Sequence, residues 1–241
     1  NGVIKIVAAD SVVSRGDILA DAASGAKAGD VEITAGRLVQ LETGSLISAW
    51  GDDLLSSGNV DITARAVSSS DGMGAEADAT VRVDGAEIRA GHITIGAAAK
   101  ADYLWDGDKD IKVGPIPLPG GPSDGPEVAI GSSIASARVL ILEGDLTARG
   151  GIALGAISES KLTTTVRDKE DRGLNVGFIF GELDSRASVD VGSTAALRAE
   201  RLNIYASNDA GLDLNVETTT EHGDSIEFAF AVGLANVATS V

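Results

Sequence analysis

The sequence predicts an all-β protein whose short strands stack as successive coils of a parallel β-helix, or β-solenoid. Two observations support this prediction. A frame of aliphatic residues and alanines recurs along the chain with the period-two alternation of strands. In addition, 44% of the residues are apolar but only 3% are aromatic, so we expect a narrow, layered interior built from Ala, Val, Ile and Leu. A β-sandwich or another mixed β arrangement remains the alternative.

The recurring frame is an aliphatic residue with an Ala two places later, a short gap, and then two aliphatic residues one apart with another Ala. Its clearest copy is Leu197, Ala199, Leu202, Ile204 and Ala206. Further copies span 146–156, 88–97, 47–64 and 18–35, and a degenerate copy spans 134–141. Each copy predicts two short strands around a tight corner. The copies are irregularly spaced, which a solenoid tolerates because each coil contacts only its neighbours and inserts become loops.

Alternating residues and turn signals predict the segments between these frames. From Ala75 to Val83, Ala and Val alternate strictly with polar and charged residues, which indicates a strand with one solvent-facing side. Asp84–Gly85 then forms a turn. Long alternating strands are also expected in 163–180 and 212–234, each interrupted by a polar turn. The chain holds 30 glycines, and Gly accepts the positive φ angles that sharp corners need.

Residues 105–127 break the pattern. All five prolines lie in this stretch. Because Pro lacks a backbone donor and fixes φ, the stretch cannot be an interior strand. We expect residues 1–241 to form a single elongated solenoid segment of a longer chain, with 105–127 as a Pro/Gly-rich excursion from it.

Charge and cysteine content exclude several classes of protein. The formal net charge is −17. This argues against a nucleic-acid partner, because affinity for phosphate backbones comes mainly from Lys and Arg, and against binding to an anionic membrane surface. The sequence has no run of about 18 apolar residues, so we expect no membrane span. The chain contains no cysteine, which excludes disulfides and thiolate sites.

Several strands resemble a known family. Residues 228–237 (FAFAVGLANV), 58–64 (GNVDITA) and 189–206 resemble the Val-Gly-x-Ala-x-Asn strands of giant secreted bacterial β-solenoid repeat proteins, the filamentous-haemagglutinin-like and leukotoxin-type adhesins. The resemblance covers most of the chain outside 105–127. It implies a right-handed β-helix at the bacterial cell surface that acts in adhesion, matrix building or filament formation. The implied partners are host or neighbouring-cell surfaces, matrix polysaccharide, or other copies of the chain, and the family has no catalytic motif to carry over.

One acidic stretch has the spacing of a calcium loop. Asp106, Asp108 and Asp110 place carboxylates at alternate positions, as loops that bind hard cations do. An EF-hand would also need Gly at the sixth position and Glu at the twelfth, where this chain has Ile111 and Pro117. A simple acidic turn is therefore the alternative to a Ca²⁺ site, and we expect no other cofactor. The chain also lacks the Gly-Gly-x-Gly-x-Asp nonapeptide of calcium-binding β-rolls.

Three aromatic residues are the candidates for ligand contact. Trp50, Tyr103 and Trp105 follow or adjoin Gly-Asp or Asp-Gly turn pairs, and exposed rings at such positions stack on sugars. Their alternative role is to cover a corner or end of the narrow core. The two histidines, His92 and His222, have no Cys or His partner at ligand spacing, and we expect plain surface positions for both. Nucleophilic catalysis therefore has no support.

These observations favour a non-catalytic structural or adhesive segment of a large bacterial extracellular surface or matrix protein. A filament that contains this segment is one form of that hypothesis. The alternative is a carbohydrate-active β-helix enzyme, either a polysaccharide lyase or a hydrolase. Its acidic and basic groups would lie on one outer sheet and come from different coils, which the sequence alone does not align. A third hypothesis is self-assembly through open end coils, because an uncapped coil exposes unpaired strand edges.

Overall fold

The computed structural model describes residues 2–70, 74–106, 127–168, 174–218 and 226–241. These residues form strands and turns, and no helix occurs among them. The paired strands all run parallel. The predicted all-β class is therefore confirmed, together with a large parallel sheet in the order β1-β4-β7-β8-β9-β10-β12.

The longest strands continue around bends, so that a single strand pairs with several others. In chain order the strands are β1 (Val3–Ala8), β2 (Ser11–Ser14), β3 (Ile18–Leu19), β4 (Asp30–Ala35), β5 (Leu38–Leu41), β6 (Leu46–Ser48), β7 (Asn59–Ser70), β8 (Ala75–Asp106), β9 (Glu127–Asp168), β10 (Leu174–Arg198), β11 (Arg201–Thr218) and β12 (Ile226–Ser240). For example, successive sections of β8 pair with β5, β6 and β7.

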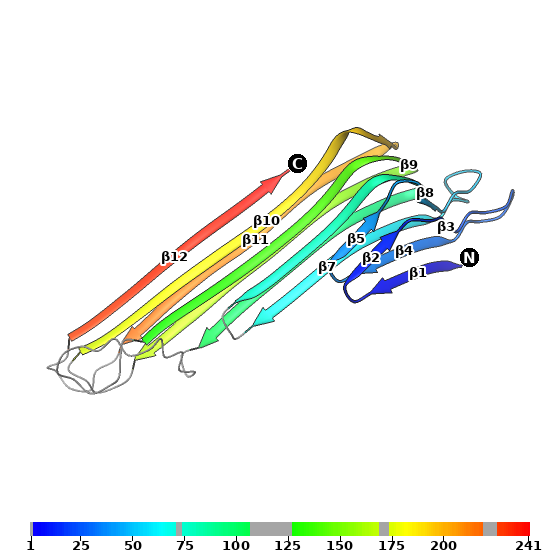
Figure 1. Cartoon of the computed structure of the whole chain (residues 1–241). Coiled ribbons are helices and arrows are strands. Elements are labelled where there is room, and N and C mark those ends of the chain that lie inside the picture. Colours follow the sequence, from blue (N-terminus) through cyan, green and yellow to red (C-terminus); the bar gives the residue numbers. More distant parts are fainter. Residues whose placement is uncertain (1, 71–73, 107–126, 169–173, 219–225) are drawn as a thin grey trace.

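The described part of the chain makes six passes, and each pass pairs with the one before it. The passes are residues 3–29, 30–58, 59–91, 92–150, 151–200 and 201–240. They lie side by side in chain order, from β1 near the N-terminus to β12 near the C-terminus (Figure 1). The passes differ widely in length, but their first strands stay aligned because each of them hydrogen-bonds to the first strand of the next pass.

The recurring sequence frame marks this alignment. One interior column consists entirely of alanine, namely Ala8, Ala35, Ala64, Ala97, Ala156 and Ala206. The column two residues earlier is Ile in every pass except the fifth, which has Leu154. Ile33, Ile62 and Ile95 of that column are fully buried. The frame therefore predicted both the strands around the corner and the columns that they form.

From the third pass onward, each pass is lengthened by a strand that runs away from the stacked corner and a strand that returns (Figure 1). The outgoing and returning strands face each other. A Cβ on Gly233 of β12, for instance, would approach Leu212 Cδ2 of β11 to 2.6 Å. The alternating residues from Ala75 to Val83 lie on a returning section, and their Ala and Val side chains are buried as predicted.

The interior of these extensions is not purely aliphatic, which corrects the expected core of Ala, Val, Ile and Leu. Ser133, Ser158, Ser160 and Ser185 are fully buried. The Oγ atoms of Ser158 and Ser185 are 2.8 Å apart, and those of Ser160 and Ser133 are 2.9 Å apart. Because each hydroxyl has a hydrogen-bond partner, a small polar side chain replaces a small apolar one at little cost.

Gly58 and Gly85 show why corners of the stack require glycine. A Cβ on Gly58 would lie 1.9 Å from the carbonyl oxygen of Gly29 in the preceding pass, so the two backbones approach too closely for any side chain. Gly85 has a φ of 77°, which completes the turn predicted at Asp84–Gly85. Tight corners of this kind let successive passes stack without a gap.

Both ends of the range predicted as an excursion, 105–127, belong to strands. β8 continues through Trp105 to Asp106, and β9 begins at Glu127. Residues 107–126, with all five prolines, lie outside the described residues. Within the described residues, no helix has the length and apolar character that crossing a bilayer requires.

A candidate ligand-binding hollow on the outer face

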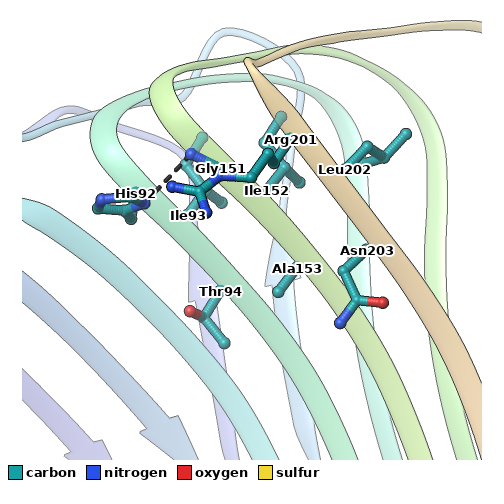
Figure 2. Close-up of a pocket in the computed structure, with 9 residues that line it drawn as sticks. All are labelled: His92, Ile93, Thr94, Gly151, Ile152, Ala153, Arg201, Leu202 and Asn203. Atoms are coloured by element: carbon teal, nitrogen blue, oxygen red, sulfur yellow. Dashed lines mark hydrogen bonds between the residues drawn. The ribbon is translucent and has the colours of Figure 1, made fainter.

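A hollow of about 570 Å³ lies on the outer face of passes 4, 5 and 6, near the start of their first strands. Its outward-facing residues form two columns: His92, Gly151 and Arg201, and then Thr94, Ala153 and Asn203. The middle pass contributes only Gly and Ala to these columns. The hollow is therefore a gap between two rows of larger polar side chains, one on β8 and one on β11 (Figure 2).

The backbone of pass 5 holds His92 at the edge of the hollow. The Gly151 N–H donates to Nδ1 of His92, with an N···N distance of 3.1 Å. The imidazole ring lies against Gly150, where a Cβ would approach its Cε1 to 2.3 Å. Because Nδ1 accepts this hydrogen bond, the neutral ring carries its proton on Nε2, which remains a donor.

Arg201 brings positive charge to the opposite row. Its exposed side chain extends over the backbone of Gly151 toward His92 (Figure 2). Among the described residues its guanidinium has no ion-pair partner. The nearby Arg198, in contrast, pairs with Asp145 and holds the pKa of that carboxyl below its ordinary value, chiefly through a side-chain hydrogen bond. The Arg201 guanidinium is therefore available to an anionic group.

An exposed aromatic ring lies next to the hollow along β11. Tyr205 is two residues after Asn203 on the same outward face, and its side chain is 42% exposed. Its ring covers Gly155 of the neighbouring pass, where a Cβ would approach the ring to 2.3 Å. A flat aromatic surface therefore continues the row of Arg201 and Asn203.

Sequence reasoning missed this site. His92 was expected to be a plain surface residue, and Arg201, Asn203 and Tyr205 were not singled out. A signal was present, because these three residues alternate with the inward-facing Leu202 and Ile204 and so had to face outward. The frame copies make residues 92, 151 and 201 equivalent, but the sequence does not show that these copies become neighbouring passes.

Trp50, a predicted ligand-contact residue, is half-buried and its ring is partly covered. The Cζ of Arg149 lies over the ring, 4.1 Å from its centroid. Arg149 also donates from Nη2 to the carbonyl oxygen of Gly51, at 2.9 Å. The structure therefore places Trp50 at a corner of the stack, packed against a cation from pass 4.

Tyr103 and Trp105 are in the core, which corrects their prediction as exposed sugar-stacking residues. Tyr103 is 2% exposed and Trp105 is 5% exposed. Both point inward on β8, two residues apart, because the alternation of Ala97, Ala99 and Ala101 continues through them. They fill the core, which is the alternative role that the sequence left open.

The predicted calcium ligands cannot be placed as a group. Asp106 ends β8, whereas Asp108 and Asp110 lie outside the described residues, as does His222. Among the residues that the structure describes, no group of three or more His, Cys, Asp or Glu side chains converges as a metal site would.

A second surface feature is an apolar patch on the outer face of the returning strands, here called the phenylalanine patch. It consists of Ile130, Phe178, Phe180, Phe228, Phe230, Val232 and Leu234 and includes every phenylalanine of the chain. Phe178 and Phe230 are register partners with ring centroids 5.2 Å apart. Phe180 has a paired strand on both sides and is still 45% exposed, so the patch faces solvent through its orientation.

Comparisons with known proteins do not extend these observations. No protein-family model, curated protein or solved structure matches the chain.

Proposed function

We propose that the chain is a right-handed parallel β-helix that serves as a non-catalytic structural and adhesive segment of a large bacterial extracellular surface or matrix protein. The observation that carries the proposal is the register of the six passes, which keeps the alanine column from Ala8 to Ala206 aligned. A pass with neighbours on both sides has its strands laddered on both edges. Such a stack is stiff and tolerates loops of any length.

The adhesive part of the proposal is supported by the phenylalanine patch. A chain with a net charge of −17 and few aromatic residues is expected to place its phenylalanines in the core. Here all four lie on one outer face, and exposed apolar patches of this kind mark contact surfaces. The resemblance to bacterial adhesins suggests the partner, which is a cell surface, a matrix polysaccharide or another copy of the chain.

Hydrogen exchange tests the structural role. We expect the amides of the paired strands in passes 2 to 5 to exchange slowly and together, because each of these passes is bonded to a neighbour on either side. Fast exchange in the middle of the stack, with protection confined to one pass, would contradict a continuous hydrogen-bonded stack of strands.

Bead adhesion tests the adhesive role. Beads coated with the chain are to be pulled from surfaces that carry a matrix polysaccharide or the chain itself. The double variant Phe180→Ser/Phe230→Ser should adhere less, whereas Val67→Ser, which removes a 68% exposed apolar residue elsewhere, should adhere like the wild type. Equal adhesion of all three proteins would refute the role of the patch, and unchanged exchange protection would show that the variants fold.

The second candidate is an enzyme that cleaves an acidic polysaccharide. It is favoured by the presence of His92 and Arg201 at one hollow, where two hydrogen-bond donors would flank a sugar carboxylate. Hydrolysis ordinarily uses two carboxylates, and the residues that line the hollow include none, so a lyase is the better form of this candidate. Appearance of the ultraviolet absorbance of an unsaturated sugar on incubation with polyuronates would support it.

A further inference from the structure

We propose that the hollow between His92 and Arg201 binds the carboxylate of an acidic sugar, with Tyr205 contacting the next sugar of the same chain. The inference rests on the proposed adhesive function in that it gives that function a site and a ligand class. Three features of the outer face support this site: the spacing of the polar groups, the availability of their donors and the adjacent exposed ring.

The spacing comes from the strand register. His92 and Arg201 are register partners of the same residue, Gly151, and therefore lie two strand spacings apart, which is about 10 Å at the Cα atoms. Thr94 and Asn203 bracket Ala153 in the same way, about 7 Å further along the strands. Four polar side chains thus mark the corners of a rectangle. Its centre is low because pass 5 has only Gly and Ala there.

The chemistry of the corners fits a carboxylate joined to a polyol. The Arg201 guanidinium, which has no ion-pair partner among the described residues, presents paired N–H donors that match the two oxygens of a carboxylate. His92 keeps Nε2 as a donor, since Nδ1 is occupied by the Gly151 N–H. Thr94 and Asn203 each offer a donor and an acceptor, as sugar hydroxyls require.

Tyr205 extends the site along β11. Its exposed ring lies over Gly155, which lets the ring rest close to the sheet. An aromatic ring in this position offers an apolar surface with a polar tip to a second sugar ring. The floor therefore continues from the hollow to Tyr205 without an intervening large side chain, since Gly151, Ala153 and Gly155 are the middle residues of the three columns.

The direct test is calorimetric titration of the chain with trigalacturonate, its methyl ester and acetate. We expect binding of trigalacturonate, at least tenfold weaker binding of the methyl ester, which lacks the charge, and no saturation by acetate. Arg201→Gln should weaken trigalacturonate binding about tenfold or more, because it removes a charged hydrogen bond. Tyr205→Ala should lower the affinity for trigalacturonate and leave the affinity for monomeric galacturonate unchanged.

Arg65→Gln is the matched control, since it makes the same charge change on an exposed residue of the neighbouring β7 and lies outside the hollow. It should bind like the wild type. If Arg65→Gln and Arg201→Gln lose affinity for trigalacturonate equally, the effect is one of net charge and the site is overturned. Equal affinity for trigalacturonate and its methyl ester would overturn the site as well. Equal saturation by acetate would overturn the sugar assignment.

His92→Ala serves as a second variant if Arg201→Gln does not fold. Hydrogen exchange across the stack is read independently, so failure of the sugar site leaves the structural proposal standing.

Discussion

The guanidinium carbon of Arg149 lies 4.1 Å from the ring centroid of Trp50, although the two residues belong to passes 4 and 2. Arg149 reaches across pass 3 at a narrow corner. Pass 3 has only Gly91 between Ala90 and His92 there, whereas the paired segment of the next strand has Arg149 and Gly150 between Ala148 and Gly151. The contact clamps pass 4 to pass 2 at this corner. The stabilisation is partly offset, because Nε of Arg149 is buried and has no hydrogen-bond partner among the residues that the structure describes.

Removing this clamp should destabilise the corner. We expect Arg149→Met to lower the free energy of unfolding by about 1–2 kcal/mol through loss of the cation–π contact and of the hydrogen bond to Gly51. Arg149→Lys keeps the charge, so its free energy of unfolding should lie between those of the unsubstituted protein and Arg149→Met. Denaturant unfolding followed by fluorescence measures this in a Trp105→Phe background, where Trp50 is the single tryptophan. A stability for Arg149→Met equal to that of the background protein would contradict the prediction.

A methyl group at Gly58 should disrupt the stacking of passes 2 and 3. Its Cβ would lie 1.9 Å from the Gly29 carbonyl oxygen, so the backbones must separate. We expect Gly58→Ala to cost about 2 kcal/mol or more, as overpacking does. The control is Gly16→Ala, whose Cβ meets nothing within 4 Å and which should change the stability by less than about 1 kcal/mol. Similar stabilities for the two variants, by denaturant unfolding, would refute the close approach.

The stability of the stack should depend on pH through Glu159. Hydrogen bonds from Lys100 and then Lys161 hold the pKa of this carboxyl below its ordinary 4.5. A lowered folded-state pKa gives stability that is present above the unfolded pKa and is lost as the pH falls through the folded value. The stability difference between wild type and Glu159→Gln should therefore be constant above about pH 5 and shrink below 4.5.

Denaturant unfolding at pH 7, 5 and 3 measures this difference, and added salt should reduce it because the three side chains are partly exposed. The ion pair of Lys5 and Glu32 serves as the comparison for the salt effect, since its side chains are more exposed than those of Lys100 and Glu159. A Glu159→Gln difference that grows as the pH falls would mean that the carboxylate is not stabilised by the two lysines.

Two buried polar atoms without partners lie on neighbouring strands. Trp105 and Thr164 are register partners, and within the described part of the chain Nε1 of the indole and Oγ1 of the hydroxyl both lack a hydrogen bond. Thr164→Val keeps the side-chain shape and removes an unsatisfied group, so it should raise the stability by about 1 kcal/mol. Ser160→Ala removes a hydroxyl that does have partners and should lower it by a similar amount. Destabilisation of both variants, by thermal unfolding, would indicate that Thr164 has a partner in solution.

The core columns were predictable from sequence because they depend on local alternation. The frame around Ile88 to Ala97 specified which residues turn inward, and the structure places them in register with their counterparts at 47–64 and 146–156. The same rule of alternation also holds at Tyr103 and Trp105, which the structure buries. The nearby turn signals, which suggested exposed rings, misled the prediction there.

The hollow was not predictable, because it depends on which residues of different passes become neighbours. The frame makes His92, Gly151 and Arg201 equivalent positions, but pass lengths vary, so the sequence does not show that their copies lie on neighbouring passes. The phenylalanines illustrate the same limit. Alternation shows that Phe228 and Phe230 share one face, and only the facing contact of Gly233 with Leu212 shows that this face is the outer one.

The sequence by itself determined the strand character of this protein, its narrow core of small side chains and the residues that turn inward at each corner. These properties follow from period-two alternation, which is local. Only the tertiary structure decided which copies of the frame become neighbouring passes and which side of the sheet carries the phenylalanines. It also decided the meeting of His92 and Arg201, because hydrogen bonds between distant segments set which passes lie side by side.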